Sequence, residues 1–145
     1  MTRIQRSALL RLPASVMFDL VDDIESYPQF LPWCEASEIL VRQQGLVEAR
    51  LDIAHGGIRK SFTTRNACEG KESMKMTLVD GPFNRLEGLW TFQPLREDAS
   101  KISLDLEFEI AGKLAGMAFG PVFGQICNSL VGAFSQRARD LYPAE

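Results

Sequence analysis

The middle of the chain consists of segments in which apolar and polar residues alternate, and this period of two constrains the fold more than any other feature. Between residues 47 and 53, Val, Ala, Leu and Ile alternate with Glu, Arg and Asp, and residues 102–110 repeat the pattern. Such alternation is typical of strands with one buried face. His55-Gly56-Gly57 and Asp80-Gly81-Pro82 predict turns between neighbouring segments. Strands joined by short turns must be antiparallel.

Both ends of the chain add helical patterns to this sheet. Residues 2–10 predict an opening strand, and Pro13 and Ser15 predict the start of a helix with Ser15 as its N-cap. A short helical turn follows between Pro28 and Pro32. Apolar residues from Leu114 to Leu141 recur every three or four positions, which predicts a long terminal helix that Pro121 kinks or splits.

This order of elements predicts an α+β fold of the helix-grip type. A curved antiparallel sheet of about seven strands has one apolar face to cover, and the terminal helix is the only segment long enough to cover it. The chain has 145 residues, which suits one domain over residues 1–145.

Composition narrows the class of function. The formal net charge is −3, which argues against DNA binding through bulk charge but leaves room for a local basic patch. The start of the chain has no apolar leader, so we expect a soluble cytoplasmic protein. Cys34, Cys68 and Cys127 show no paired spacing, and we expect reduced thiols that serve as small buried side chains.

Three features predict an incompletely filled interior. Glycines recur every four residues in the terminal helix (Gly116, Gly120, Gly124), and close helix–sheet packing is the alternative explanation. Flexible methionines suit an adaptable lining, although each also suits an ordinary core (Met17, Met74, Met76, Met117). Large apolar residues gather at turns and strand ends, where they either line a cavity mouth or plug it (Phe30, Leu31, Trp33, Phe83, Leu86, Trp90, Phe119, Phe123).

The sequence offers no convincing catalytic set. His55 is the only histidine and lies in a predicted turn, and no metal-ligand spacing or phosphate-binding loop is present. Lys60 and Asn66 share the parity of Ile58 and Phe62, so we expect them to point inward and to orient a polar head group. We therefore expect a binding protein that is not an enzyme and needs no cofactor or metal.

Three motifs in order carry a resemblance to a known family. They are residues 26–34 (SYPQFLPWC), residues 60–66 (KSFTTRN), and residues 78–83 (LVDGPF) with their continuation through Trp90 to Leu95. The chain resembles the coenzyme Q-binding branch of the START-like superfamily, also labelled polyketide cyclase/dehydrase or oligoketide cyclase/lipid transport. Within that branch it is most similar to the bacterial ribosome-association toxins. The broken terminal helix (Gly116, Gly120, Pro121, Gly124) departs from what those bacterial relatives lead us to expect.

The resemblance implies a ubiquinone-like isoprenoid quinone as ligand, with a role in respiratory quinone function and transient contact with a membrane surface. It places the tunnel mouth at Phe30, Leu31, Pro32 and Trp33, and a sheet contact at Trp90. With the inward residues of the apolar segments, the expected ligand-binding set is Phe30, Leu31, Pro32, Trp33, Phe62, Met76, Phe83, Leu86, Trp90, Phe119, Val122 and Phe123.

Two other functions stay open at this point. The ribosome-association toxins imply binding to the 50S subunit that blocks 70S formation and inhibits translation. Arg59, Arg65, Arg137 and Arg139 are the candidate RNA contacts, and solvated charges are the alternative explanation. The cyclase or aromatase label of the family implies an enzyme, for which a titratable cavity floor would be needed.

Overall fold

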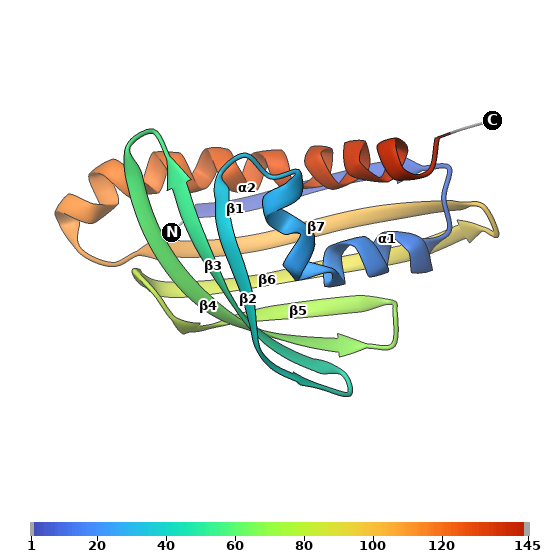
Figure 1. Cartoon of the computed structure of the whole chain (residues 1–145), viewed down its shortest axis with the longest axis horizontal. Coiled ribbons are helices and arrows are strands. Elements are labelled where there is room, and N and C mark those ends of the chain that lie inside the picture. Colours follow the sequence, from blue (N-terminus) through green and yellow to red (C-terminus); the bar gives the residue numbers. More distant parts are fainter. Residues whose placement is uncertain (1, 144–145) are drawn as a thin grey trace.

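The computed structural model describes residues 2–143, and for residues 113–117 only the backbone. Its elements follow the predicted order (Figure 1). They are β1 (Thr2–Leu10), α1 (Ala14–Asp22), the short 3₁₀ helix η1 (Ile24–Gln29), β2 (Cys34–Gln43), β3 (Leu46–His55), β4 (Ile58–Glu69), β5 (Ser73–Asp80), β6 (Phe83–Arg96), β7 (Ala99–Ile110) and α2 (Lys113–Leu141).

The seven strands form one antiparallel sheet in the order β1-β7-β6-β5-β4-β3-β2. From β2 to β7 each strand pairs with its neighbour in sequence, as the short turns require. β1 instead pairs with β7, from Thr2 opposite Phe108 to Leu10 opposite Ser100. The predicted α+β helix-grip fold with seven strands and a long terminal helix is confirmed.

The sheet curves around the space beneath α2. In Figure 1, β1, β7 and β6 run along α2, whereas β2, β3 and β4 rise steeply toward it. Register shifts interrupt the β2–β3, β4–β5 and β6–β7 pairings, and such irregularities bend a strand and increase its twist. The concave face thereby encloses a volume that one helix must cover.

The structure corrects the predicted cap of the first helix and decides one of the two alternatives predicted for Pro121. α1 begins at Ala14 with Pro13 at its N-cap position and no side-chain cap, so Ser15 lies inside the helix. The fixed φ of proline suits a helix start without a capping hydroxyl. Pro121 does not split the terminal segment, because α2 is one helix through it. Buried Phe119 and Phe123 anchor the helix on both sides of the proline.

No helix in the described part of the chain is both long and apolar enough to cross a bilayer.

Gly81 occupies a turn that only glycine suits. Its φ is +151°, and a Cβ built there would lie 2.7 Å from the Phe62 Cβ and 3.2 Å from the Phe62 Cα. Gly132 differs on both counts, because it is exposed within α2 and a Cβ there would meet no atom within 4 Å. The two glycines therefore make a matched pair for testing the fold.

We expect Gly81→Ala to lower the free energy of unfolding by about 1–3 kcal/mol, through backbone strain and the contact with Phe62. Gly132→Ala should raise it by about 0.5–1 kcal/mol, because alanine loses less conformational entropy in a helix than glycine. Urea unfolding of both variants measures the two changes. Equal effects, or a neutral Gly81→Ala, would contradict the turn geometry.

Candidate ligand-binding site

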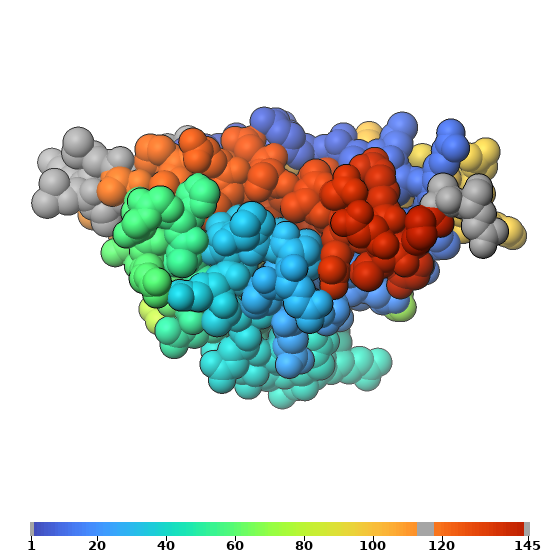
Figure 2. Space-filling view, turned by 45° about the horizontal axis from the view of Figure 1, so that its top comes forward, coloured from blue at the N-terminus to red at the C-terminus, as the bar shows by residue number. Residues whose placement is uncertain are grey.

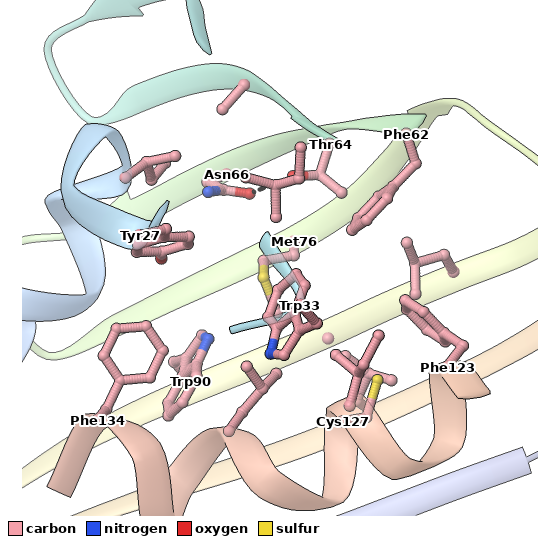
Figure 3. Close-up of a pocket in the computed structure, with 18 residues that line it drawn as sticks. Tyr27, Trp33, Phe62, Thr64, Asn66, Met76, Trp90, Phe123, Cys127 and Phe134 are labelled. Carbon is pink, nitrogen blue, oxygen red and sulfur yellow. Dashed lines mark hydrogen bonds between the residues drawn. The ribbon is translucent and has the colours of Figure 1, made fainter. Parts of the chain in front are cut away.

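A cavity lies between the concave face of the sheet and α2, with about 70 Å³ open to water-sized molecules. This volume holds several waters but is smaller than an isoprenoid quinone. Figure 3 shows its labelled side chains converging from the sheet, η1 and α2. The lining residues are Ile24, Tyr27, Trp33, Ala49, Leu51, Phe62, Thr64, Asn66, Met76, Leu86, Gly88, Trp90, Leu106, Phe123, Ile126, Cys127, Leu130 and Phe134.

The periodicity of each element explains which of its side chains reach the cavity. On β4 the lining residues are two apart (Phe62, Thr64, Asn66), and on β6 the same holds (Leu86, Gly88, Trp90). Alternate side chains of a strand share one face. On α2 the lining residues are three or four apart, which places them on one helix face (Phe123, Ile126, Cys127, Leu130, Phe134).

Two clusters of aromatic rings, most of them paired edge-to-face, reach the two ends of the cavity. In Figure 3, Phe62 and Phe123 lie at one end, and Tyr27, Trp90 and Phe134 lie at the other. The Phe83 cluster comprises Phe62, Phe83, Phe108, Phe119 and Phe123, with ring centroids 4.8–6.5 Å apart. The Phe134 cluster comprises Phe18, Tyr27, Phe30, Trp90, Phe92 and Phe134, with centroids 5.3–6.2 Å apart.

α2 spans both clusters and carries smaller side chains between them. Phe123 belongs to the Phe83 cluster and Phe134 to the other, about 16 Å further along the helix at 1.5 Å per residue. Ile126, Cys127 and Leu130 lie in between and face the cavity. The bulky rings thus set the distance between helix and sheet, and the smaller side chains leave the gap unfilled.

Gly88 enlarges the gap from the sheet side. A Cβ at this position would lie 2.6 Å from the Met76 Cε and 3.2 Å from the Leu106 Cδ1. The Met76 and Leu106 side chains therefore occupy part of the room that a residue at position 88 would fill. The floor of the cavity is adjustable, because a methionine side chain repacks easily.

The polar atoms of the lining form a small set. Thr64 Oγ1 donates to Asn66 Oδ1 at 3.0 Å, and the Tyr27 hydroxyl donates to the backbone carbonyl of Val21. Trp33 Nε1 is buried without a hydrogen-bond partner. The cavity is therefore apolar, with a few oriented donors.

Among the side chains that the structure describes, no Asp, Glu, Lys, Arg or His lines the cavity. Burial raises the pKa values of its two titratable groups, Tyr27 and Cys127, well above their ordinary range. Both stay protonated near neutral pH, so neither has the pKa near 7 that general acid–base chemistry favours.

The other two thiols are also protonated at neutral pH. Burial, with a smaller contribution from the charge of Asp52, raises the pKa of Cys34 to about 11, and burial raises the pKa of Cys68. All three cysteines are free, and Cys68 is only partly buried. In the described residues, no three His, Cys, Asp or Glu side chains gather as a metal site would require.

A family model described as "Polyketide cyclase / dehydrase and lipid transport" matches residues 10–135 of the chain. The chain belongs to this family. It is 50% identical to the Ribosome association toxin RatA of Pseudomonas aeruginosa over 97% of this chain and 98% of that protein.

Two further similarities are more distant. The chain is 26% identical to the mitochondrial Coenzyme Q-binding protein COQ10 homolog B of Xenopus laevis, over 94% of this chain and 57% of that protein. The Zhui aromatase/cyclase of Streptomyces sp. R1128 superposes with a TM-score of 0.83 at 18% identity, covering 98% and 96% of the two chains. At that identity the likeness shows a shared fold alone.

Half of the site residues expected from the sequence line the cavity of this family member. They are Trp33, Phe62, Met76, Leu86, Trp90 and Phe123. The other six do not. Phe83 and Phe119 lie in the Phe83 cluster, Phe30 in the Phe134 cluster, Leu31 in the core, and Val122 is partly buried, whereas Pro32 is exposed. A role in ligand binding stays a prediction for all twelve.

Of the two residues predicted to orient a polar head group, one lines the cavity and the other does not. Asn66 is 4% exposed and lines the cavity. Lys60, expected to point inward as well, is exposed near the β3–β4 turn. The alternation of β4 therefore predicts its buried half but not its end, where solvent accepts a lysine on either face.

The glycine and methionine features point less clearly to a cavity than expected. A Cβ at Gly120 would meet only Ile110 at 3.8 Å, and one at Gly124 would meet nothing within 4 Å, so neither marks a close helix–sheet approach. Met76 lines the cavity, whereas Met17 and Met74 are fully buried core residues. Only the backbone is described at Gly116 and Met117, so the two predictions are not tested at these positions.

Several lining residues were not among the predicted site residues, although the sequence pattern indicated their direction. Ile126, Cys127, Leu130 and Phe134 follow the helical spacing of the terminal segment. Their position opposite Gly88 and Thr64 depends on how the helix lies across the sheet, which spacing alone does not give. Tyr27 sits within the SYPQFLPWC motif, one turn before the predicted mouth.

We expect Gly88→Val to close the cavity. The new methyl groups would displace Met76 and occupy the gap, while the free energy of unfolding changes by less than about 2 kcal/mol, because valine suits a strand and the nearest atom, the Met76 Cε, is the end of a flexible side chain that can move. Binding of an apolar fluorescent dye should fall at least several-fold.

Leu89→Val is the matched control, since Leu89 is the next residue on β6 and is 42% exposed on the opposite face. Undiminished dye binding by a folded Gly88→Val protein would mean that this cavity is not the binding site.

Proposed function

We propose that this chain associates with ribosomes, as the name of its RatA relative says of that protein. The observation that carries the proposal is the 50% identity over almost the full length of both chains. By this proposal the protein binds the 50S subunit, prevents its joining to the 30S subunit, and so lowers translation.

A ribosome presents a phosphate-rich surface, so the proposal needs cations that are free to pair with it. Most arginines of the described chain are already paired with carboxylates, for example Arg59 with Glu35 at 3.0 Å and Arg65 with Glu48 at 3.5 Å. Arg137 lies over the Phe30 ring, 4.9 Å from its centroid, and donates to Gln29. These three predicted contacts are therefore engaged within the protein.

Arg11 and Arg139 are better placed for phosphate contact. Both are exposed, neither has an ion pair among the described residues, and they line one groove between the β1–α1 connection and the end of α2. Exposed Leu9 and Tyr142 flank them. Figure 2 shows the last turns of α2 (red) open to solvent on this side of the molecule. We propose this groove as the ribosome-facing surface.

Added protein should lower the 70S peak of bacterial ribosomes in a sucrose gradient, raise the free 50S and 30S peaks, and sediment with the 50S fraction. Arg11→Glu or Arg139→Glu should weaken 50S binding and reduce the slope of log K against log salt by about 0.7–0.9 for each lost phosphate contact.

Lys75→Glu makes the same change in charge on the convex face, where Lys75 is exposed, and should leave binding almost unchanged. Unaltered 70S levels at saturating protein would end the ribosome proposal. Equal loss with Lys75→Glu would mean that the surface is elsewhere.

A second proposal concerns the cavity: it holds an apolar small molecule, and an isoprenoid quinone is our first candidate. The enclosed apolar lining supports it, as does the likeness to a coenzyme Q-binding protein at 26% identity. Because the present volume is about 70 Å³, a quinone ring enters only if side chains such as Met76 and Leu130 repack. The cyclase reaction of the structural neighbour is not proposed, since the described lining supplies no group poised for proton transfer.

Protein purified from cells that make isoprenoid quinones should release an isoprenoid compound on organic extraction, and native mass spectrometry should show the matching mass increase. Gly88→Val should lose this mass increase, whereas the matched variant Leu89→Val should retain it. No isoprenoid in the extract, together with no uptake of added short-chain ubiquinone, would refute the ligand proposal and leave ribosome binding untouched.

A further inference from the structure

Trp33 brings an unused hydrogen-bond donor to the cavity. Its side chain is 6% exposed, it lines the cavity, and its Nε1 has no partner. A buried donor without an acceptor is rare, since it forfeits its hydrogen bond to water. Such a donor in the wall of a cavity indicates that a bound molecule supplies the hydrogen-bond acceptor.

Backbone hydrogen bonds on both sides fix the main chain of Trp33. The amide of Ala54 on β3 donates to the Trp33 carbonyl at 2.9 Å, and the Cys34 amide donates to the Leu31 carbonyl at 3.0 Å. Trp33 is thereby fixed between the end of η1 and the first residue of β2. The main chain is fixed by these bonds, and the side chain is held by its packing, since Trp33 is only 6% exposed.

Asn66 supplies a second donor in the same cavity. It is 4% exposed on β4, opposite Met76 of β5. Its Oδ1 accepts from Thr64 Oγ1 at 3.0 Å, which fixes the orientation of the amide. The two Nδ2 hydrogens have no recorded acceptor among the described residues. Figure 3 shows Asn66, Trp33 and Trp90 around one space.

Acceptors for these donors are scarce in the lining. Charged residues are absent from it, and the Tyr27 hydroxyl proton is already given to the Val21 carbonyl. The remaining acceptors are the Thr64 and Tyr27 oxygen lone pairs, the second lone pair of Asn66 Oδ1, and two weakly accepting sulfur atoms, Met76 and Cys127. None of them accepts from Trp33 Nε1, so the described cavity presents an unused N–H donor inside an apolar shell.

We propose that Trp33 and Asn66 form a subsite that selects neutral, apolar ligands carrying a carbonyl-type oxygen, and that it favours the oxidised, quinone form over the hydroquinone. The proposal rests on the apolar-ligand function above and adds its selectivity. A quinone oxygen only accepts, which matches the donors. A hydroquinone adds two O–H donors, and burying a donor without a partner weakens binding.

The test compares three probes by displacement of a bound apolar dye: a short-chain alkyl ubiquinone, its hydroquinone, and an alkylbenzene with the same chain but no oxygen. The wild-type protein should bind the quinone roughly 5- to 100-fold more tightly than either other probe. This comparison needs no variant, so it does not depend on a substituted protein folding.

Trp33→Phe keeps an aromatic ring and removes the N–H. It should lose most of the preference for quinone while its affinity for the alkylbenzene changes little. Ser100→Ala is the matched control, because Ser100 Oγ is the other buried group without a partner in the described chain and lies outside the cavity. It should leave all three affinities unchanged.

The outcomes separate this proposal from the one beneath it. If no probe binds, both the proposed apolar-ligand function and the proposed subsite are refuted. If quinone and alkylbenzene bind equally, or if a folded Trp33→Phe keeps the preference, the cavity binds apolar molecules but the donor subsite is wrong, and a water molecule satisfies Trp33.

Discussion

The packing of α2 across the curved sheet is the interaction on which the rest of the structure depends. The helix rests on the Phe83 cluster at one end and on the Phe134 cluster at the other. Edge-to-face aromatic pairs add about 0.5–1.5 kcal/mol each beyond the area they bury, so these two contacts are well defined. Between them the helix carries only Ile126, Cys127 and Leu130 toward the sheet. Because the two clusters hold both parts of the helix at a fixed distance from the sheet, the segment between them cannot move closer to the sheet. The space beneath it therefore remains as the cavity.

The chemistry of the cavity follows from its position. A volume enclosed by strand faces and one apolar helix face receives mainly hydrophobic side chains, and the charged residues remain on the convex face in exposed pairs such as Arg3 with Asp105. Surface pairs of this kind contribute little to stability. The few polar groups inside are neutral, and burial keeps Tyr27 and Cys127 protonated. The proposed binding of an apolar ligand through a few hydrogen bonds rests on this environment.

The fold and the family do not by themselves decide between ribosome association, ligand binding and catalysis. The same architecture occurs in an aromatase/cyclase at 18% identity, which shows that the helix-grip fold accommodates enzymes. What distinguishes this chain is its 50% identity to a ribosome association toxin and a described cavity lining without charged groups. The two proposals use different parts of the molecule. One uses the groove at Arg11 and Arg139, and the other uses the interior between sheet and helix.

The sequence by itself determined the elements, their antiparallel order and the inward face of most strands. Period-two alternation and helical spacing are local consequences of one buried face, so they can be read without knowing what covers that face. Alternation predicted Phe62 and Asn66 as inward residues, and both line the cavity, whereas Lys60 of the same parity is exposed. Only the tertiary structure decided that Leu31 and Phe83 support the core while Cys127 and Gly88 line the cavity. That difference depends on where the helix crosses the sheet and which rings hold it there, and both are set by contacts between residues far apart in the chain.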